Sequence, residues 1–299
     1  MALVINSNIA SLNAQRKLNA TSNSLSSTFQ RLSSGLRINS ARDDAAGMAV
    51  STRMTAQVRG LNQAVRNSND AISMVQVAGG ALDETVNALQ RMRELVVQAS
   101  SETLTSADRG DIWEEVTQLA SEIDRIATNT NYNGQVLMTG GFSAATSGIY
   151  IQTGASAGQT MQINLGPANA SNIGIGGAAS IVTAYNVGGA SAGDTGNTGL
   201  STTDARTLMA SMLGRVDDAI ASVSDIRSEL GAVQNRFESI MANLSNVSEN
   251  TAQARSRIMD ADIAEETSKL TKLSIMQQAG TAILAQANQQ PQLALQLLG

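Results

Sequence analysis

Histidine and cysteine, the side chains that most often carry out protein chemistry, are both missing from this chain of 299 residues. Without imidazole or thiolate, the chain has no Ser-His or Cys-His nucleophile pair and no metal site built on these ligands. Carboxylate-based enzymes usually gather their acidic residues in an aromatic-lined pocket. Aromatic residues make up only 2% of this chain, and its acidic residues are dispersed along it. We therefore expect no enzyme, no cofactor and no metal.

One glycine-rich run superficially resembles a phosphate-binding loop, namely Gly174-Ile175-Gly176-Gly177. A phosphate loop of that kind continues into Lys-Ser or Lys-Thr and joins a strand to a helix, and neither feature is present. The run lies within residues 140 to 203, which hold 14 of the 25 glycines and a single charged residue, Asp194. We interpret this stretch as structural rather than as a site.

The elements that would have to position any site are long amphipathic helices. An apolar seam in alternating three- and four-residue steps runs from residue 205 to 258, which is the 3.5-residue repeat of a coiled coil. Similar seams cover 54 to 96 and 112 to 126, the latter after a capping box at Thr105 and Asp108. The helix over 205 to 258 alone would be roughly 80 Å long, so the sequence predicts a rod.

Between the second and third long helices the pattern changes to short strands and turns. Residues 149 to 153 and 159 to 165 alternate apolar and polar side chains around 154 to 158, which predicts a β-hairpin. Residues 174 to 203 have no such pattern and predict a short, irregular Gly-rich surface insert. The expected fold is mainly α, with antiparallel coiled-coil helices, a small β-hairpin region and paired terminal helical arms.

The two terminal arms carry narrow apolar stripes in an otherwise polar sequence. Isolated helices of this kind are marginal in water, so we expect the arms to order only when other copies surround them. If the receiving surface lies elsewhere on an identical copy, the contact does not close and generates a helical filament. The stripe residues, our candidates for self-assembly, are Ile5, Ile9, Leu12, Leu25, Phe29, Leu32, Leu36, Ile263, Leu270, Leu273, Met276, Ile283 and Leu284.

Charge and hydropathy limit the partners. The net charge of −5 is modest, and the five basic residues among 1 to 42 indicate a solvated helix face, so we expect no nucleic-acid partner. No apolar run approaches the ~18 residues of a membrane span, so we expect no membrane insertion. The N-terminus also lacks the pattern of a cleaved signal peptide.

Three runs in this chain resemble the signatures of bacterial flagellin. They are SGLRINSARDDAAGMAV at 34 to 50, LGAVQNRF at 230 to 237, and AQANQQP at 285 to 291. Their order and their distance from each terminus also match the family. The signature residues of the first run are Arg37, Asn39, Asp43, Asp44 and Gly47.

The resemblance implies a structural subunit that self-assembles into the helical flagellar filament, an extracellular organelle of swimming, after unfolded export through a type III apparatus. By the same resemblance, residues 1 to 40 and 260 to 299 form an inner coiled-coil layer. Residues 41 to 173, with the hairpin, and 204 to 259 form an outer tube, and 174 to 203 is the variable insert.

The resemblance also implies partners. These are identical subunits, hook-associated junction proteins, filament cap proteins, an export chaperone that masks the C-terminal arm, and toll-like receptor 5 of hosts. The segment from 89 to 95 is similar to the receptor-bound segment of the family, with Arg91, Leu95 and Glu115 as contact residues. Two alternatives remain open: a hook-associated junction protein and a secreted coiled-coil effector that does not polymerise.

Overall fold

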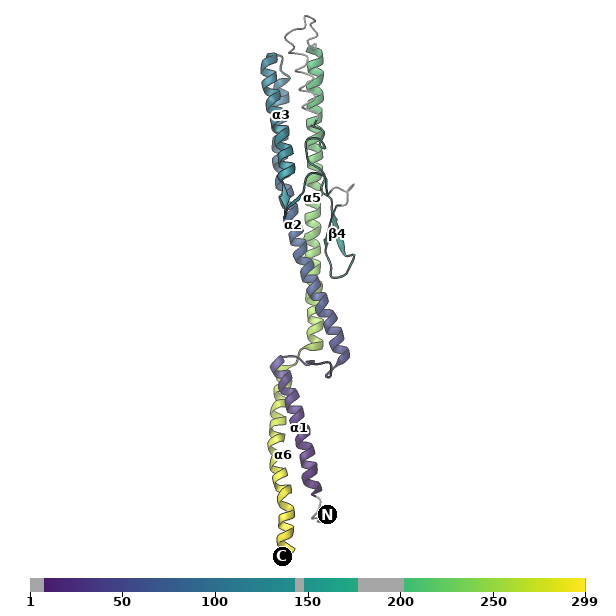
Figure 1. Ribbon diagram of the computed structural model, residues 1–299, viewed down its shortest axis with the longest axis vertical. Coiled ribbons are helices and arrows are strands. Elements are labelled where there is room, and N and C mark those ends of the chain that lie inside the picture. The colour runs from purple at the N-terminus through teal and green to yellow at the C-terminus, as the bar shows by residue number, and fades with distance from the viewer. Residues whose placement is uncertain (1–7, 143–147, 177–201, 299) are drawn as a thin grey trace. The chain divides into compact units, whose positions relative to one another are not determined.

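The computed structural model describes residues 8–142, 148–176 and 202–298, which are mainly helical (Figure 1). They belong to two compact units. One comprises Met1–Arg59 with Val247–Gly299, and the other Gly60–Asn246. Long helices are present in both units, which confirms the mainly α class. Ile5 and residues 177–201 of the expected insert lie outside the described residues.

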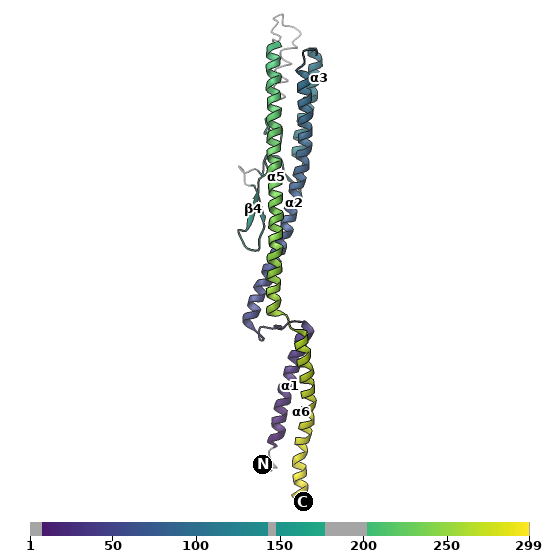
Figure 2. The ribbon, with the colours of Figure 1, turned by 180° about the vertical axis from the view of Figure 1, so that it is seen from behind.

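In the first unit, α1 (Ile9–Ser34) and α6 (Ile263–Leu298) lie side by side and antiparallel (Figures 1 and 2). The Asn8 side chain caps α1 by accepting a hydrogen bond from the N–H of Ser11 at 3.0 Å. The helix ends at Gly35, whose φ of 70° is left-handed and is readily adopted only by glycine. The two terminal arms are therefore a paired helical element, as predicted.

The second unit packs parts of three long helices together: α2 (Ala45–Ala99), α3 (Ser106–Asn129) and α5 (Thr202–Met259). α2 and α5 each continue into the first unit. The capping box of α3 is present, because Thr105 Oγ1 accepts from the N–H of Asp108 and Asp108 Oδ2 accepts from the N–H of Thr105. The largest fully buried side chains of the core include Trp113, Phe237 and Leu82.

Two short antiparallel hairpins follow α3. β3 (Ile149–Gln152) pairs with β4 (Thr160–Ile163), with Ile149 opposite Ile163. Met161 and Ile163 are buried while Tyr150 is exposed, so the alternation that predicted this hairpin does define a buried and a solvated face. The sequence analysis did not predict β1 (Asn131–Tyr132) and β2 (Gln135–Val136), a pair with a two-residue turn.

The apolar seam predicted for α5 is interrupted at one position near its C-terminal end, and Thr251, Ala254 and Ile258 beyond that position are half-buried. Phe237 is fully buried. Val247, which the three- and four-residue steps of the predicted seam reach ten residues later, is 37% exposed, and Ser248 beside it is buried. The change coincides with the boundary between the two units at Asn246 and Val247.

Candidate functional site

The pair of terminal arms, α1 and α6, is held together at its far end by polar contacts. Asn8 Nδ2 donates to the carbonyl of Ala287 at 2.7 Å, and Ser11 Oγ donates to Asn288 Oδ1 at 2.7 Å. Farther along the pair, Leu18 packs against α6 at Gly280, where an added Cβ would lie 3.2 Å from the Leu18 Cδ1 atom. These contacts fix an antiparallel register from one end of the arms.

Near the other end of the arms, a buried charge replaces apolar packing. Glu266 of α6 is only 5% exposed, and its Oε1 lies 3.7 Å from Arg31 Nη1 of α1 and 3.2 Å from Lys269 Nζ. Lys269 also pairs with Glu265 at 2.8 Å, and hydrogen bonds to Glu265 and then Glu266 raise the pKa of Lys269. A buried ion pair adds little net stability because desolvation offsets the attraction.

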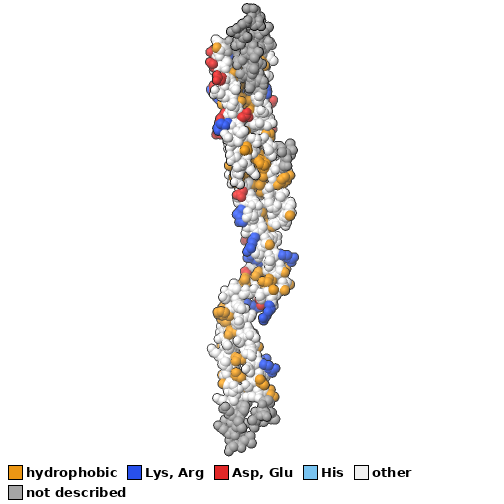
Figure 3. Space-filling model, in the orientation of Figure 1, with side chains coloured by type: hydrophobic (Ala, Val, Ile, Leu, Met, Phe, Trp, Pro, Cys, Tyr) orange, Lys and Arg blue, Asp and Glu red, His pale blue; other side chains and the backbone are white. Residues whose placement is uncertain are grey.

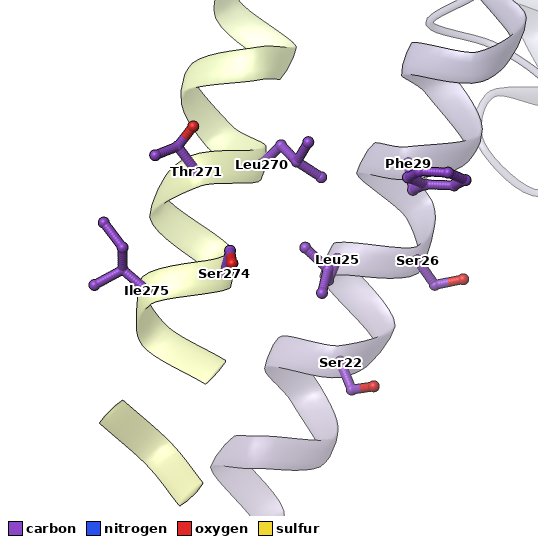
Figure 4. A pocket seen from close by; sticks show the side chains of 8 residues that line it. All are labelled: Ser22, Leu25, Ser26, Phe29, Leu270, Thr271, Ser274 and Ile275. Carbon is purple, nitrogen blue, oxygen red and sulfur yellow. The ribbon is translucent and has the colours of Figure 1, made fainter. Parts of the chain in front are cut away.

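Between these ends the two helices enclose a shallow groove of about 630 Å³ (Figure 4). Figure 4 shows Leu25 and Leu270 pointing toward one another across it, while Phe29 and Ile275 point away. Phe29 is 63% exposed and Ile275 is 61% exposed. The lining mixes these apolar side chains with serine and threonine, so the arms share only a narrow apolar contact.

The predicted stripe residues separate into two sets. One set is half-buried: Leu25, Leu32, Leu36, Leu270, Leu273 and Leu284. The other set is exposed, with 48% to 68% of each side chain accessible: Ile9, Leu12, Phe29, Ile263, Met276 and Ile283. Figure 3 shows apolar spots on a mostly uncharged surface over both helices. The pair uses one half of its stripes and leaves the other half uncovered.

Very little of either arm is buried within the single chain. In α1 the buried residue is Thr28, and in the described part of α6 Glu266 and Ala287 are buried. Neither Thr28 nor Glu266 gains hydrophobic stabilisation from its position. The stability of this element therefore depends on a few half-buried leucines and on local hydrogen bonds.

The connection from α1 to α2 contains all of the signature residues except Gly47, which lies in the first turn of α2, and it is hydrogen-bonded to the connection from α5 to α6. Leu36 forms an isolated antiparallel bridge with Asp260, and the carbonyl of Gly35 accepts from the N–H of Ala261 at 2.9 Å. Arg37 donates from Nη2 to the carbonyl of Ile258 at 2.7 Å. The two connections are thus held together by backbone hydrogen bonds and by the Arg37 side chain.

The two signature aspartates close the turns that lead into α2. Asp43 Oδ2 accepts from the N–H of Ser40 at 2.9 Å, from the Ser40 hydroxyl at 3.0 Å and from the N–H of Asn39 at 3.2 Å. These bonds, chiefly those from Ser40, lower the pKa of Asp43. Asp44 Oδ1 accepts from the N–H of Gly47 at 2.9 Å, as an N-cap of α2 does.

Gly47 occupies a position with no room for a side chain. A Cβ there would meet the carboxylate of Asp44 and would lie 2.7 Å from the Cδ1 atom of buried Ile38. The hydrogen bonds and close packing of the signature residues therefore hold the connection between α1 and α2 in shape. Their geometry indicates a structural role.

The residues predicted for receptor contact lie on α2 and α3. Arg91 Nη2 is 3.0 Å from Glu115 Oε1, and Arg91 Nη1 is 3.2 Å from Glu94 Oε2. Arg91 and Glu115 have about half of their side chains exposed, whereas Leu95 is 2% exposed. The structure brings Arg91 and Glu115 together as one surface pair and places Leu95 in the core beneath them.

Sequence reasoning missed the contacts that hold the arms in register. The sequence did not point to Asn8, Ser11, Arg31 or Glu266. The one available signal was the opposite charge of Arg31 and of Glu266, which lies in the first turn of α6. These four residues can be recognised only once the pairing of α1 with α6 is known, because the pairing shows which polar side chains meet.

In the described ranges, no cluster of three or more acidic residues is placed to hold a metal ion. None of the described helices is both long and apolar enough to cross a bilayer.

Comparison with known proteins decides the family. The model of the bacterial flagellin N-terminal helical region matches residues 5–143, and that of the C-terminal helical region matches 213–298. A flagellin of Halalkalibacterium halodurans is 42% identical over 296 residues, which cover 99% of this chain and 100% of the relative. This chain belongs to the bacterial flagellin family. A flagellin of Bacillus subtilis is 43% identical over 310 residues, covering 98% of this chain and 99% of the relative.

Flagellins are structural proteins, the extracellular subunits of the flagellar filament, and the chain shares this role. Among solved structures, one titled as a flagellar hook-associated protein of Vibrio parahaemolyticus aligns with a TM-score of 0.56. It is 18% identical and covers 73% of this chain and 100% of that chain, so the likeness shows the fold alone. The fold is shared by both kinds of flagellar protein, and the sequence places this chain with the flagellins.

Proposed function

We propose that this flagellin self-assembles into the helical filament used for swimming, through the exposed apolar faces of α1 and α6. The observation that supports the proposal is the uncovered half of the stripes, represented by Phe29 and Ile283 at 63% and 59% exposure. Fully burying one such side chain is worth about 1.5–3 kcal/mol. Covering several at once therefore favours association with other copies.

Two full-length variants test the role of these faces. Phe29→Gln combined with Ile283→Gln should raise the concentration needed for polymerisation by at least about tenfold, because polar side chains replace the apolar contact. Asn23→Gln, an exposed polar change on α1, is the matched control and should polymerise normally. Sedimentation under assembly conditions measures both. Normal pelleting of the double variant would contradict the role given to the faces.

We further propose the layer assignment that the resemblance implied. Residues 1 to 40 and 260 to 299 form the inner layer, and 41 to 173 with 204 to 259 form the outer tube around it. Residues 174 to 203 form the variable insert. The low burial in α1 and α6 supports the inner assignment, because such helices need surrounding copies. Removing 1 to 40 and 260 to 299 should abolish pelleting, and filaments from the trimmed chain would refute the assignment.

Export as an unfolded chain through a type III apparatus is the third part of the proposal. The sparse burial in the arms means that little stability has to be overcome before passage. The absence of cysteine prevents disulfides from trapping the chain. An export chaperone would mask the exposed residues of the C-terminal arm, Ile263, Met276 and Ile283. Replacing all three with Gln should weaken chaperone capture, and unchanged capture would argue against this contact.

The surface pair of Arg91 and Glu115 supports recognition by toll-like receptor 5, with Leu95 holding the helix face from below. Arg91→Ala should lower receptor signalling while polymerisation stays normal. Arg93→Ala is a matched control, because Arg93 is similarly exposed and pairs with Asp217 at 2.7 Å. Equal signalling by wild type and Arg91→Ala would count against the contact.

By the same proposal, hook-associated junction proteins and filament cap proteins are the partners of this chain at the two ends of the filament. The two alternatives predict different particles: a hook-associated junction protein should form short fragments, and a non-polymerising effector should remain monomeric. Electron microscopy of the purified protein separates them, because our proposal predicts long tubes.

A further inference from the structure

The methionines of this chain are unequally exposed. Of the 12 methionines, Met1 lies outside the described residues, and Met276 is the exposed one among the rest, with 48% of its side chain accessible. Four are half-buried. Six are buried in the core of the second unit: Met74, Met92, Met138, Met161, Met209 and Met212.

Met276 lies at the edge of the contact between α6 and α1. Gly280, one helical turn later on the same side of α6, lies against Leu18, yet 48% of the Met276 side chain is accessible. Ile283, one heptad after Met276, and Ile275 beside it are both exposed. Met276 therefore belongs to the uncovered apolar face through which the proposed assembly takes place.

We propose that Met276 is an oxidation site of the unassembled chain, and that its oxidation blocks assembly. This inference rests on the proposed function. The oxidant is a peroxide: the thioether sulfur attacks one peroxide oxygen, the O–O bond breaks, and the sulfur becomes a sulfoxide while hydrogen peroxide is reduced to water. The chain has no cysteine, so no thiol of its own competes for the oxidant.

The same face explains why the modification matters only before assembly. A sulfoxide is polar, so burying it against another copy without a hydrogen-bond donor is unfavourable, whereas the thioether packs well in irregular apolar contacts. In the assembled state the neighbouring copy covers Met276 and excludes peroxide. Assembly thus protects the residue, and oxidation removes damaged chains from assembly.

The test treats dilute full-length chain with limited hydrogen peroxide, maps sulfoxides by peptide mass spectrometry, and measures the critical concentration by sedimentation. Met276 should be oxidised before the six buried methionines, and the critical concentration should rise about tenfold. Met276→Leu should have the same critical concentration before and after the same peroxide dose, whatever that concentration is. Met241→Leu, which removes a half-buried methionine, should stay as sensitive as wild type.

Preformed filaments provide a second readout, since Met276 should resist peroxide there. The inference is overturned if the buried methionines react first, if chains with Met276 sulfoxide polymerise as well as untreated ones, or if filaments leave Met276 fully reactive. These results differ from failure of the proposed function, in which untreated wild type and Met276→Leu would both fail to polymerise. That result would overturn the inference as well.

Discussion

At the scale of single residues, the types of residue in the signature segment are explained by hydrogen bonds to the backbone and by the lack of space for a side chain at Gly47. Asp43 accepts three hydrogen bonds from Asn39 and Ser40 in the preceding turn, and Asp44 caps α2. Gly47 leaves room for the side chain of Ile38. These roles were not predictable from the sequence, because a motif match says that the residues belong together without saying what each touches.

Gly47→Ala tests the space at the start of α2. Its methyl group would press on Ile38 and displace the Asp44 cap, so the first unit should lose about 1–3 kcal/mol of unfolding free energy. Denaturant unfolding followed by circular dichroism measures the loss. Gly79→Ala is the control, because nothing lies within 4 Å of its added Cβ and the helix should gain roughly 0.5–1 kcal/mol. Equal effects of the two changes would contradict the packing described.

Asp43 makes the segment sensitive to acid. Its folded-state pKa lies below the ordinary value of 3.8, so the charged form is bound more strongly by the folded chain. The stabilisation is present above pH 3.8 and is lost as the pH falls through the folded-state pKa. Thermal melting between pH 5 and pH 2 should show this loss in wild type and a smaller one in Asp43→Asn. Parallel pH profiles for the two proteins would argue against the role of Asp43.

At the scale of elements, periodicity predicted the three long helices, the capping box and the β3–β4 hairpin. These features are local, since each depends on side chains a few residues apart or on one alternating face. The exposure of Val247 was missed because a heptad count gives the side of the helix on which a residue lies and does not show where the neighbouring helices stop covering that side. The register of α1 against α6 was also missed, because it depends on pairs such as Arg31 and Glu266 that are far apart in sequence.

Two truncations in α5 test where its seam ends. Phe237→Ala removes a fully buried ring and should lower the unfolding free energy of the second unit by about 3–5 kcal/mol. Val247→Ala should cost less than about 1 kcal/mol, because that side chain is already 37% exposed. Urea unfolding of each variant gives the comparison. A large loss at Val247 would restore the seam that the sequence predicted.

At the scale of the whole molecule, burial is concentrated in one of the two units. The large buried side chains, including Trp113, Phe237 and Met138, belong to the second unit, whereas the terminal arms bury few residues and leave half of their apolar stripes uncovered. The sequence predicted this contrast from the width of the stripes. It did not predict which stripe residues face the partner arm, since that requires knowing how the two arms pair.

The central claim is that the arms gain their stability from neighbouring copies. Hydrogen exchange, measured residue by residue on dilute chain and on polymer, tests it most directly. We expect the amides of α1 and α6 to exchange fast in the dilute chain while those of α3 are protected, and all three helices to be protected in the polymer. Slow exchange throughout α1 and α6 in the dilute chain would contradict the claim.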